Sequence, residues 1–207
     1  MKHQMQCEEA VHGILFFSTT SVLVVAATIR KLDVAEGDVI SLLKKLKALQ
    51  EERAYTYNLF HEGHKLYLAS GPNYNFTKFR QLVHDVTQEF KRISEGVIAL
   101  EAKLRPVNPK LVRVIQHLQE AEKAKLQLTA RQQLAMQRLQ DQPDQEEEIR
   151  EELMQIRSGL NSVCETITDC CEEAKYAMHD YMNQDDCKEQ VHINSRERHR
   201  VNSYVPV

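Results

Sequence analysis

Two histidines one helical turn apart are the first side chains in this sequence that could bind a metal. His61-Glu62-Gly63-His64 is close to the zinc-protease pattern HExxH, which needs histidines at i and i+4 on one helix. Here the histidines are at i and i+3, and the sequence offers no identifiable third ligand. We therefore interpret both as histidines on a solvated or interhelical face, and we predict no metal site.

Adjacent cysteines are the second candidate for chemistry. Asp169 and Glu172 flank Cys170 and Cys171, and negative neighbours raise the pKa of a thiol and make it less reactive. We therefore expect Cys170 to be a small core residue. The five cysteines of the chain form no CxxC pair, which favours reduced thiols in the cytosol or nucleus.

Clustered carboxylates are the third candidate. Glu146–Glu148, Glu151–Glu152 and Glu172–Glu173 could act as paired catalytic acids, but on a long acidic helix they are typical of a solvated face. The sequence contains no glycine-rich phosphate loop and no GxSxG nucleophile motif. We predict no catalytic residues and no cofactor, and therefore a protein that is not an enzyme.

Basic residues are concentrated in one part of the chain. Residues 105–142 hold seven basic and three acidic residues, whereas residues 143–189 hold four basic and fourteen acidic ones. The net charge of −3 does not suggest a general nucleic-acid binder. Direct DNA binding through the basic segment remains one hypothesis. The candidate contacts to DNA or to a protein partner are Lys110, Arg113, Lys123, Arg131 and Arg138.

Long helices are the elements that must position these side chains. The chain has only six glycines and five prolines in 207 residues, too few turn glycines for an α/β enzyme of this size. We predict helices over about 33–69, 76–104, 109–140 and 145–183. Asp33 and Glu36 have capping-box spacing, and Asn75 and Asn108 can cap the second and third helices. The turns are predicted at Ser70–Asn73 and Asp141–Asp144 and around Pro106.

Apolar side chains recur every three or four residues in three of these helices. The second helix has the cleanest seam, made of Phe76, Phe79, Val83, Val86, Phe90, Ile93, Val97, Leu100 and Leu104. The third has a weaker one: Val114, Leu118, Ala121, Leu128, Ala135 and Leu139, interrupted by Lys125 and Gln132. The fourth has Ile149, Leu153, Ile156, Leu160, Val163, Ile167, Cys170, Ala174, Ala177 and Tyr181.

Short loops favour antiparallel packing of neighbouring helices, so we expect an all-α antiparallel bundle of four long amphipathic helices with coiled-coil-like seams. The basic third helix and the acidic fourth helix should form one hairpin. The seams could also pair with a second copy of the chain. The bundle is expected over residues 33–184, and the polar residues 185–207 are expected to be a disordered tail.

An apolar N-terminal extension, residues 1–32, precedes the bundle. Residues 10–29 carry no full charge, and this length can cross a bilayer. Basic residues that follow, including Arg30 and Lys31, would leave the bundle in the cytosol if the segment inserted. Two other interpretations stay open: a cleaved signal peptide, and a non-membrane extension that packs on the bundle or stays disordered.

Three segments resemble the "required for excision 1-B" domain family. They read LKALQEERAYTYNLFHEGHKLYL, PNYNFTKFRQLVHDVTQEFKRIS and LQEAEKAKLQLTARQQLAMQ, within a resemblance that covers about residues 40–180. The resemblance implies an association with DNA excision repair and an intracellular, nuclear or cytoplasmic location. It implies no active-site residue.

Together, these observations predict a non-enzymatic helical protein-interaction module that is associated, through the family, with DNA excision repair. One alternative is a membrane-tethered cytosolic coiled-coil adaptor. The other is the DNA binder that would use the basic third helix.

Overall fold

Four long α-helices make up the described part of the chain. The structure, a computed structural model, describes residues 36–202, with side chains described from Val39 to Gln184. The helices are α2 (Glu36–Ala69), α3 (Phe76–Leu104), α4 (Pro109–Asp141) and α5 (Glu146–Asn202), and a short 3-10 turn, η2 (Pro143–Gln145), precedes α5. Within residues 36–202 there is no strand, so the predicted all-α bundle is confirmed.

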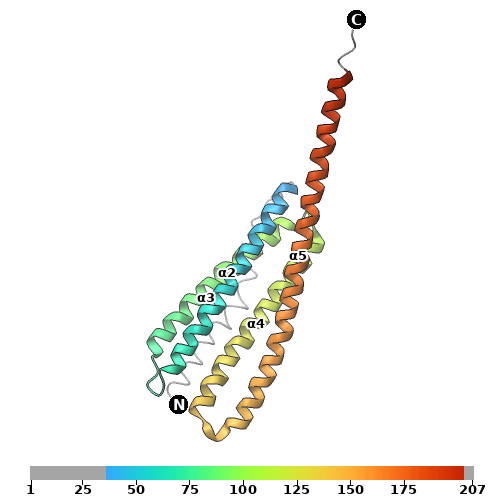
Figure 1. The fold of residues 1–207 in the computed structure, drawn as a ribbon. Helices are drawn as coiled ribbons and strands as arrows, with labels where there is room; N and C mark the ends of the chain where they lie inside the picture. Colours follow the sequence, from blue (N-terminus) through green and yellow to red (C-terminus); the bar gives the residue numbers. More distant parts are fainter. Residues whose placement is uncertain (1–35, 203–207) are drawn as a thin grey trace.

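The helices form two antiparallel hairpins that lie against each other (Figure 1). The α4–α5 pair makes the most extensive contact, followed by the α2–α3 pair. Both hairpin turns, α2–α3 and α4–α5, lie at one end of the bundle, which we call the tip end. The α3–α4 turn lies at the other end, from which α5 projects, and we call it the exit end.

Side-chain caps fix where α3 and α4 begin. The Asn75 side chain accepts a hydrogen bond from the backbone N–H of Lys78, and the Asn108 side chain accepts one from Leu111. Pro109 occupies the first turn of α4, where a missing N–H costs nothing. The cap predicted for α2 includes Asp33, which lies outside the described residues.

The end of α5 differs from the sequence-based expectation. The helix continues to Asn202, where the sequence suggested an end near Asn183 and a disordered tail. No glycine or proline occurs between Leu160 and Val205, so nothing in the local chemistry stops the helix. Figure 1 shows this last part of α5 extending beyond the other helices. Residues 203–207 lie outside the described part.

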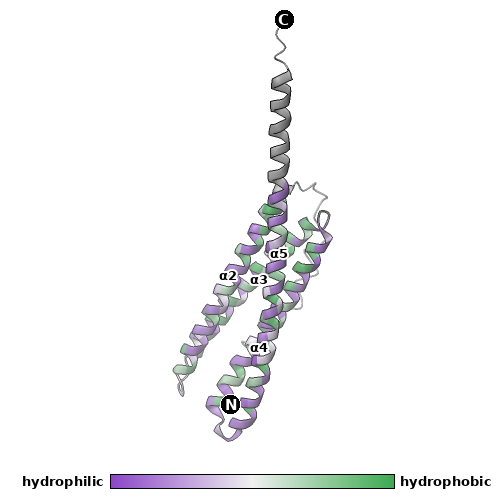
Figure 2. Cartoon of the chain, turned by 45° about the vertical axis from the view of Figure 1, so that its right-hand side comes forward, coloured by the Kyte–Doolittle hydropathy of each residue, from purple (hydrophilic) through white to green (hydrophobic). Residues whose placement is uncertain are grey.

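Three apolar clusters hold the helices together, and Figure 2 shows hydrophobic residues along the sides where helices meet. The exit-end core takes residues from all four helices, including Leu46, Val97, Ile115 and Cys170. The tip core takes residues from α2, α3 and α4, including Phe60 and Phe79. A third cluster joins α4 to the first half of α5. At the tip end, therefore, α4 lies between the α2–α3 hairpin and α5.

The predicted seam of α3 is the buried face of that helix. Eight of its nine positions are buried, from Phe79 to Leu104, and Phe76 is partly buried against the tip core. The seam of α5 is less deeply covered. Its buried members are Ile149, Ile156, Cys170 and Ala174, and the others are partly buried.

Candidate interaction surfaces

The five basic residues singled out on α4 differ in their surroundings. Arg131 and Arg138 both form ion pairs with Glu152 of α5, and the Arg138 side chain is the more deeply covered of the two. Lys110, Arg113 and Lys123 are exposed. From Lys110 to Arg138 the helix rises about 42 Å, so these side chains are also spread along its length.

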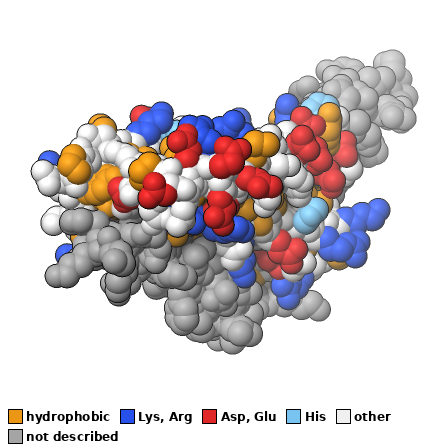
Figure 3. Space-filling model, turned by 90° about the horizontal axis from the view of Figure 1, so that it is seen from below, with side chains coloured by type: hydrophobic (Ala, Val, Ile, Leu, Met, Phe, Trp, Pro, Cys, Tyr) orange, Lys and Arg blue, Asp and Glu red, His pale blue; other side chains and the backbone are white. Residues whose placement is uncertain are grey.

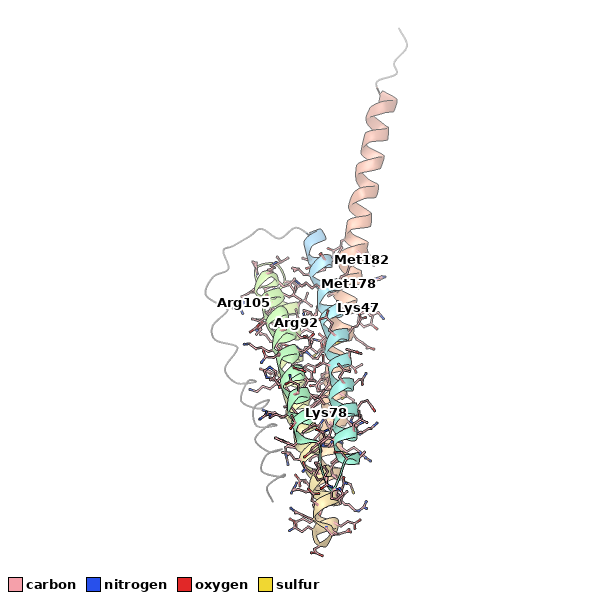
Figure 4. The ribbon with its side chains drawn as sticks, turned by 90° about the vertical axis from the view of Figure 1, so that its left-hand side faces the viewer. Lys47, Lys78, Arg92, Arg105, Met178 and Met182 are labelled. Carbon is pink, nitrogen blue, oxygen red and sulfur yellow. The ribbon has the colours of Figure 1, made fainter. Side chains whose placement is uncertain are left out.

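Basic side chains elsewhere on the bundle are also mixed with acidic ones. Arg92 pairs with Glu89 on its own helix and with Glu52 on α2, and Arg105 pairs with Glu101. Figure 4 shows Lys78 nearer the tip end than Arg92 and Arg105. On the face visible in Figure 3, basic and acidic side chains are interspersed.

The two histidines of the metal hypothesis have different environments. His61 is exposed, whereas His64 is 1% exposed and lies beside Tyr67 and Phe79, with its ring centroid 5.7 Å from that of Phe79. Burial, and to a smaller extent the His61 charge, lowers the pKa of His64 to about 4. Among the described side chains, no group of three or more His, Cys, Asp or Glu could hold a metal ion.

The aromatic residues around the α2–α3 turn mostly pack on one another. The Tyr67 ring stacks on Phe79 with centroids 4.3 Å apart, and Tyr57 lies 4.7 Å from Phe90. The Tyr74 hydroxyl donates a hydrogen bond of 2.5 Å to Asp141, which ties the turn to the end of α4. Tyr55 is exposed. This packing closes the tip end of the hairpin.

Cys170 is a core residue, in agreement with the interpretation from sequence. It is buried in the exit-end core, and its sulfur lies 3.8 Å from His117 Nδ1. Burial and the nearby Glu173 and Asp169 carboxylates raise the pKa of its thiol. Burial and Glu122 likewise raise the pKa of Cys171. Raised pKa values leave both sulfurs as poorly reactive thiols at neutral pH.

A buried polar layer crosses the middle of the bundle. The Arg53 guanidinium on α2 donates hydrogen bonds to Ser94 Oγ at 3.3 Å and to Gln119 Oε1 at 3.1 Å. Its Nη1 atom lies 3.9 Å from Glu122 Oε2, with both side chains almost fully buried. The layer therefore links α2, α3 and α4 between the exit-end core and the tip core.

The second part of this polar layer surrounds Tyr57. The Tyr57 hydroxyl donates a hydrogen bond to the backbone oxygen of Glu122 at 3.3 Å, and the Lys125 ammonium lies 4.1 Å from the centre of the Tyr57 ring. Burial raises the pKa of Glu122, while the Arg53 and Lys125 charges oppose that shift. An ion pair that spans two helices at one level fixes how far one helix slides along the other.

The sequence analysis did not predict that Arg53 and Glu122 are buried, although the spacing of Arg53 indicated it. Arg53 falls on the same three- and four-residue spacing as the buried α2 residues Leu46, Leu49, Thr56 and Phe60. A charged residue at a core position of an amphipathic helix requires a buried partner. Glu122 gave a weaker signal, because it lies next to the predicted seam residue Ala121 rather than on it.

Large apolar side chains are exposed on two helices. On α2 they are Tyr55, Leu59 and Leu66, of which Leu66 is 75% exposed. On α5 they are Met154, Tyr176 and Met182. Figure 4 shows Met182 and its partly buried neighbour Met178 near the exit end. Exposed aromatic and long apolar groups are the kind of side chain that protein–protein interfaces bury.

The membrane hypothesis concerns residues 10–29, which lie outside the described residues. Within the part of the chain that the structure describes, no helix has both the length and the apolar character needed to cross a bilayer.

Comparisons with known proteins identify relatives. The family model described as DNA repair REX1-B matches residues 41–136, which cover most of α2, all of α3 and most of α4. The Mus musculus "Required for excision 1-B domain-containing protein" is 30% identical over 143 residues, or 68% of this chain and 82% of that protein. The Bos taurus protein of the same name is 37% identical over 97 residues, or 46% of this chain and 54% of that protein. No solved structure matches. The chain therefore belongs to the required for excision 1-B domain family.

Proposed function

We propose that this protein is a non-enzymatic interaction module that contributes to DNA excision repair by binding other proteins inside the cell. The observation that carries the proposal is family membership, since the matched residues include most of the helical bundle. The exposed side chains Tyr55, Leu59 and Leu66 support a binding role, because they offer apolar area on a rigid helix. The nucleus is the location that this role requires.

The repair part of the proposal is tested in cells from which the chain has been removed. We expect slower loss of ultraviolet photoproducts from DNA in these cells, and full recovery when the complete chain is restored. Removal of photoproducts at the normal rate in cells that lack the chain would contradict the repair role.

The binding part is tested with a variant that carries Tyr55→Ala, Leu59→Ala and Leu66→Ala. Alanine keeps the helix, and none of the three side chains belongs to an apolar cluster of the core, so we expect the fold to be retained. We expect this variant to restore repair poorly. The matched control replaces three exposed polar residues of α2, Lys44, Glu51 and Asn58, with alanine and should restore repair fully. Equal recovery with both variants would show that this face of α2 is not used.

A further inference from the structure

We infer that the outer face of α5 binds a lysine- and arginine-rich amphipathic helix of a partner protein. This outer face is defined here as Glu165, Asp169, Glu172, Tyr176 and Asp180, all of them exposed. Their spacing of four, three, four and four residues places them on one side of the helix over about 22 Å. The inference rests on the proposed function and adds the chemistry of the partner.

The fold fixes this outer face in place. On the opposite side of α5, Cys170 and Ala174 are buried in the exit-end core, and Ile167, Ala177 and Tyr181 pack against it. The Tyr181 hydroxyl also accepts a hydrogen bond from the Asn108 side chain at the start of α4. Because the backbone of α5 is held from behind, a partner would meet carboxylates that are already aligned, and little conformational entropy would be lost on binding.

Charge indicates what the partner must carry. From Glu146 to Gln184, α5 has ten acidic and three basic residues. Among the described residues, no basic side chain forms an ion pair with the four carboxylates of the outer face. Four such groups on one side of a helix repel nucleic acid and anionic membranes, and they attract a partner with aligned positive charges.

The molecule already contains one basic helix docked on α5. Along the inner flank of α5, Glu152 receives Arg131 and Arg138 from α4, seven residues apart on that helix. The outer face presents four further carboxylates, directed towards solvent and three to eight residues apart. A helix with basic residues every three or four positions could place several of them against these carboxylates at once.

Tyr176 supplies the apolar contact. Its side chain is 67% exposed between Glu172 and Asp180, so a docking helix would cover its ring. A lysine or arginine beside that ring would gain a cation–π contact, as Lys125 does over Tyr57 inside the bundle. A partner that combines basic residues with an apolar one therefore fits better than a purely basic segment.

The direct test measures binding of a synthetic peptide to the full chain by fluorescence anisotropy. The probe is an alanine-based helix of about 18 residues whose lysines and single leucine follow the spacing of the outer face. A second peptide of identical composition spreads its lysines around the helix. We expect the patterned peptide to bind about 10-fold more tightly, because only its lysines can reach several carboxylates of the outer face at once. Equal affinity for the two peptides would overturn the inference.

Charge reversal identifies the face. Glu165→Lys, Asp169→Lys and Glu172→Lys together should weaken binding of the patterned peptide at least about 10-fold. The matched control, Glu51→Lys, Asp85→Lys and Glu120→Lys, changes the net charge equally on the other three helices and should weaken binding less than about threefold at physiological salt. Equal losses in the two variants would show that only overall charge matters.

Two further measurements complete the test. Tyr176→Ala should weaken binding about threefold to 10-fold, because the ring contact to the leucine and to a neighbouring lysine of the peptide is lost; no change would remove Tyr176 from the site. We expect the wild-type chain to sediment as a monomer. A dimer that is lost in the triple charge-reversal variant would instead show that the outer face binds a second copy of the chain. Peptide binding and photoproduct removal are separate readouts, so failure of the partner chemistry is distinguishable from failure of the repair role.

Discussion

At the residue scale, burial gives His64 and Glu122 properties that their sequence neighbours do not reveal. His64 belongs to the HEGH segment, which by pattern alone suggests a metal ligand, yet its ring packs among aromatic side chains in the tip core. Glu122 belongs to a helix rich in lysine and arginine, yet it lies beside Arg53 in the interior. Burial disfavours the charged form of both groups, with opposite effects on their pKa values.

The lowered pKa of His64 predicts acid sensitivity. An unfolded histidine takes up a proton near pH 6.5 and the folded one only near pH 4, so stability from this group is complete above pH 6.5 and is lost as pH falls towards 4. We expect the wild-type chain to lose about 3 kcal/mol more unfolding free energy between pH 7 and pH 4 than the His64→Phe variant. Urea denaturation at several pH values measures this, with the exposed His61→Gln as control. Parallel pH profiles for wild type and His64→Phe would contradict it.

The raised pKa of Glu122 predicts the opposite dependence of stability on pH. The folded state keeps the proton to a higher pH than the unfolded state, so stability from this group is present below pH 4.5 and is lost as pH rises through the folded pKa. We expect Glu122→Gln, which cannot ionise, to gain stability relative to wild type as pH rises from 4 towards 8. The difference in unfolding free energy between the two proteins isolates this group from all others. A difference that is independent of pH would disprove the prediction.

At the element scale, the sequence predicted well where seams and caps were clear. The bounds of α3 agree with the prediction because Asn75 caps its start and apolar residues repeat without interruption to Leu104. The pairing of basic α4 with acidic α5 is also as predicted, through Arg131, Arg138 and Glu152. The same contact engages two of the candidate contact residues, Arg131 and Arg138, and the sequence could not show which basic side chains turn towards α5.

Gly63 on α2 lies in close contact with the Leu82 side chain on α3. A Cβ atom on Gly63 would lie 2.0 Å from Leu82 Cδ2, so any larger residue requires Leu82 to move. Gly63→Ala gains about 1 kcal/mol of helix propensity, and the cost of moving the partly buried Leu82 side chain offsets part of that gain.

We therefore expect Gly63→Ala to be clearly more favourable in a Leu82→Ala background than in wild type. A double-mutant cycle of thermal or urea denaturation should give a coupling of up to about 1 kcal/mol between the two positions. Gly159→Ala paired with Leu82→Ala provides a control with no shared contact, since Gly159 faces Leu128. Additive effects at Gly63 and Leu82 would show that the two helices are not in close contact there.

At the scale of the whole molecule, the four-helix architecture followed from the sequence, but the internal polar layer and the length of α5 did not. We assigned core positions from apolar residues alone, so the charged Arg53 was not predicted to be a core residue. It also treated residues 185–202 as disordered because they are polar, whereas helix formation depends equally on the absence of glycine and proline. For residues 185–202, a polar composition is therefore compatible both with a disordered tail and with a continued helix.

The two parts of α5 should differ in local stability. Residues 167–181 are packed along the exit-end core, whereas residues 185–202 extend past the other helices (Figure 1). A helix without tertiary packing opens readily in water. We expect amide hydrogens of residues 185–202 to exchange at least about 100-fold faster than those of residues 167–178. Hydrogen exchange read by mass spectrometry measures both; slow exchange in the extension would show that it is held by another surface.

The length of α5 also sets a distance. Its final 18 residues, Asp185–Asn202, correspond to about 27 Å of helix axis, so the helical end is carried well away from the bundle body. While the extension is helical, it places Asn202 at a defined distance from the bundle, and each local opening of the helix shortens that distance. A fluorophore attached near residue 202 should accordingly report a longer separation from α4 than a flexible coil of the same length would allow.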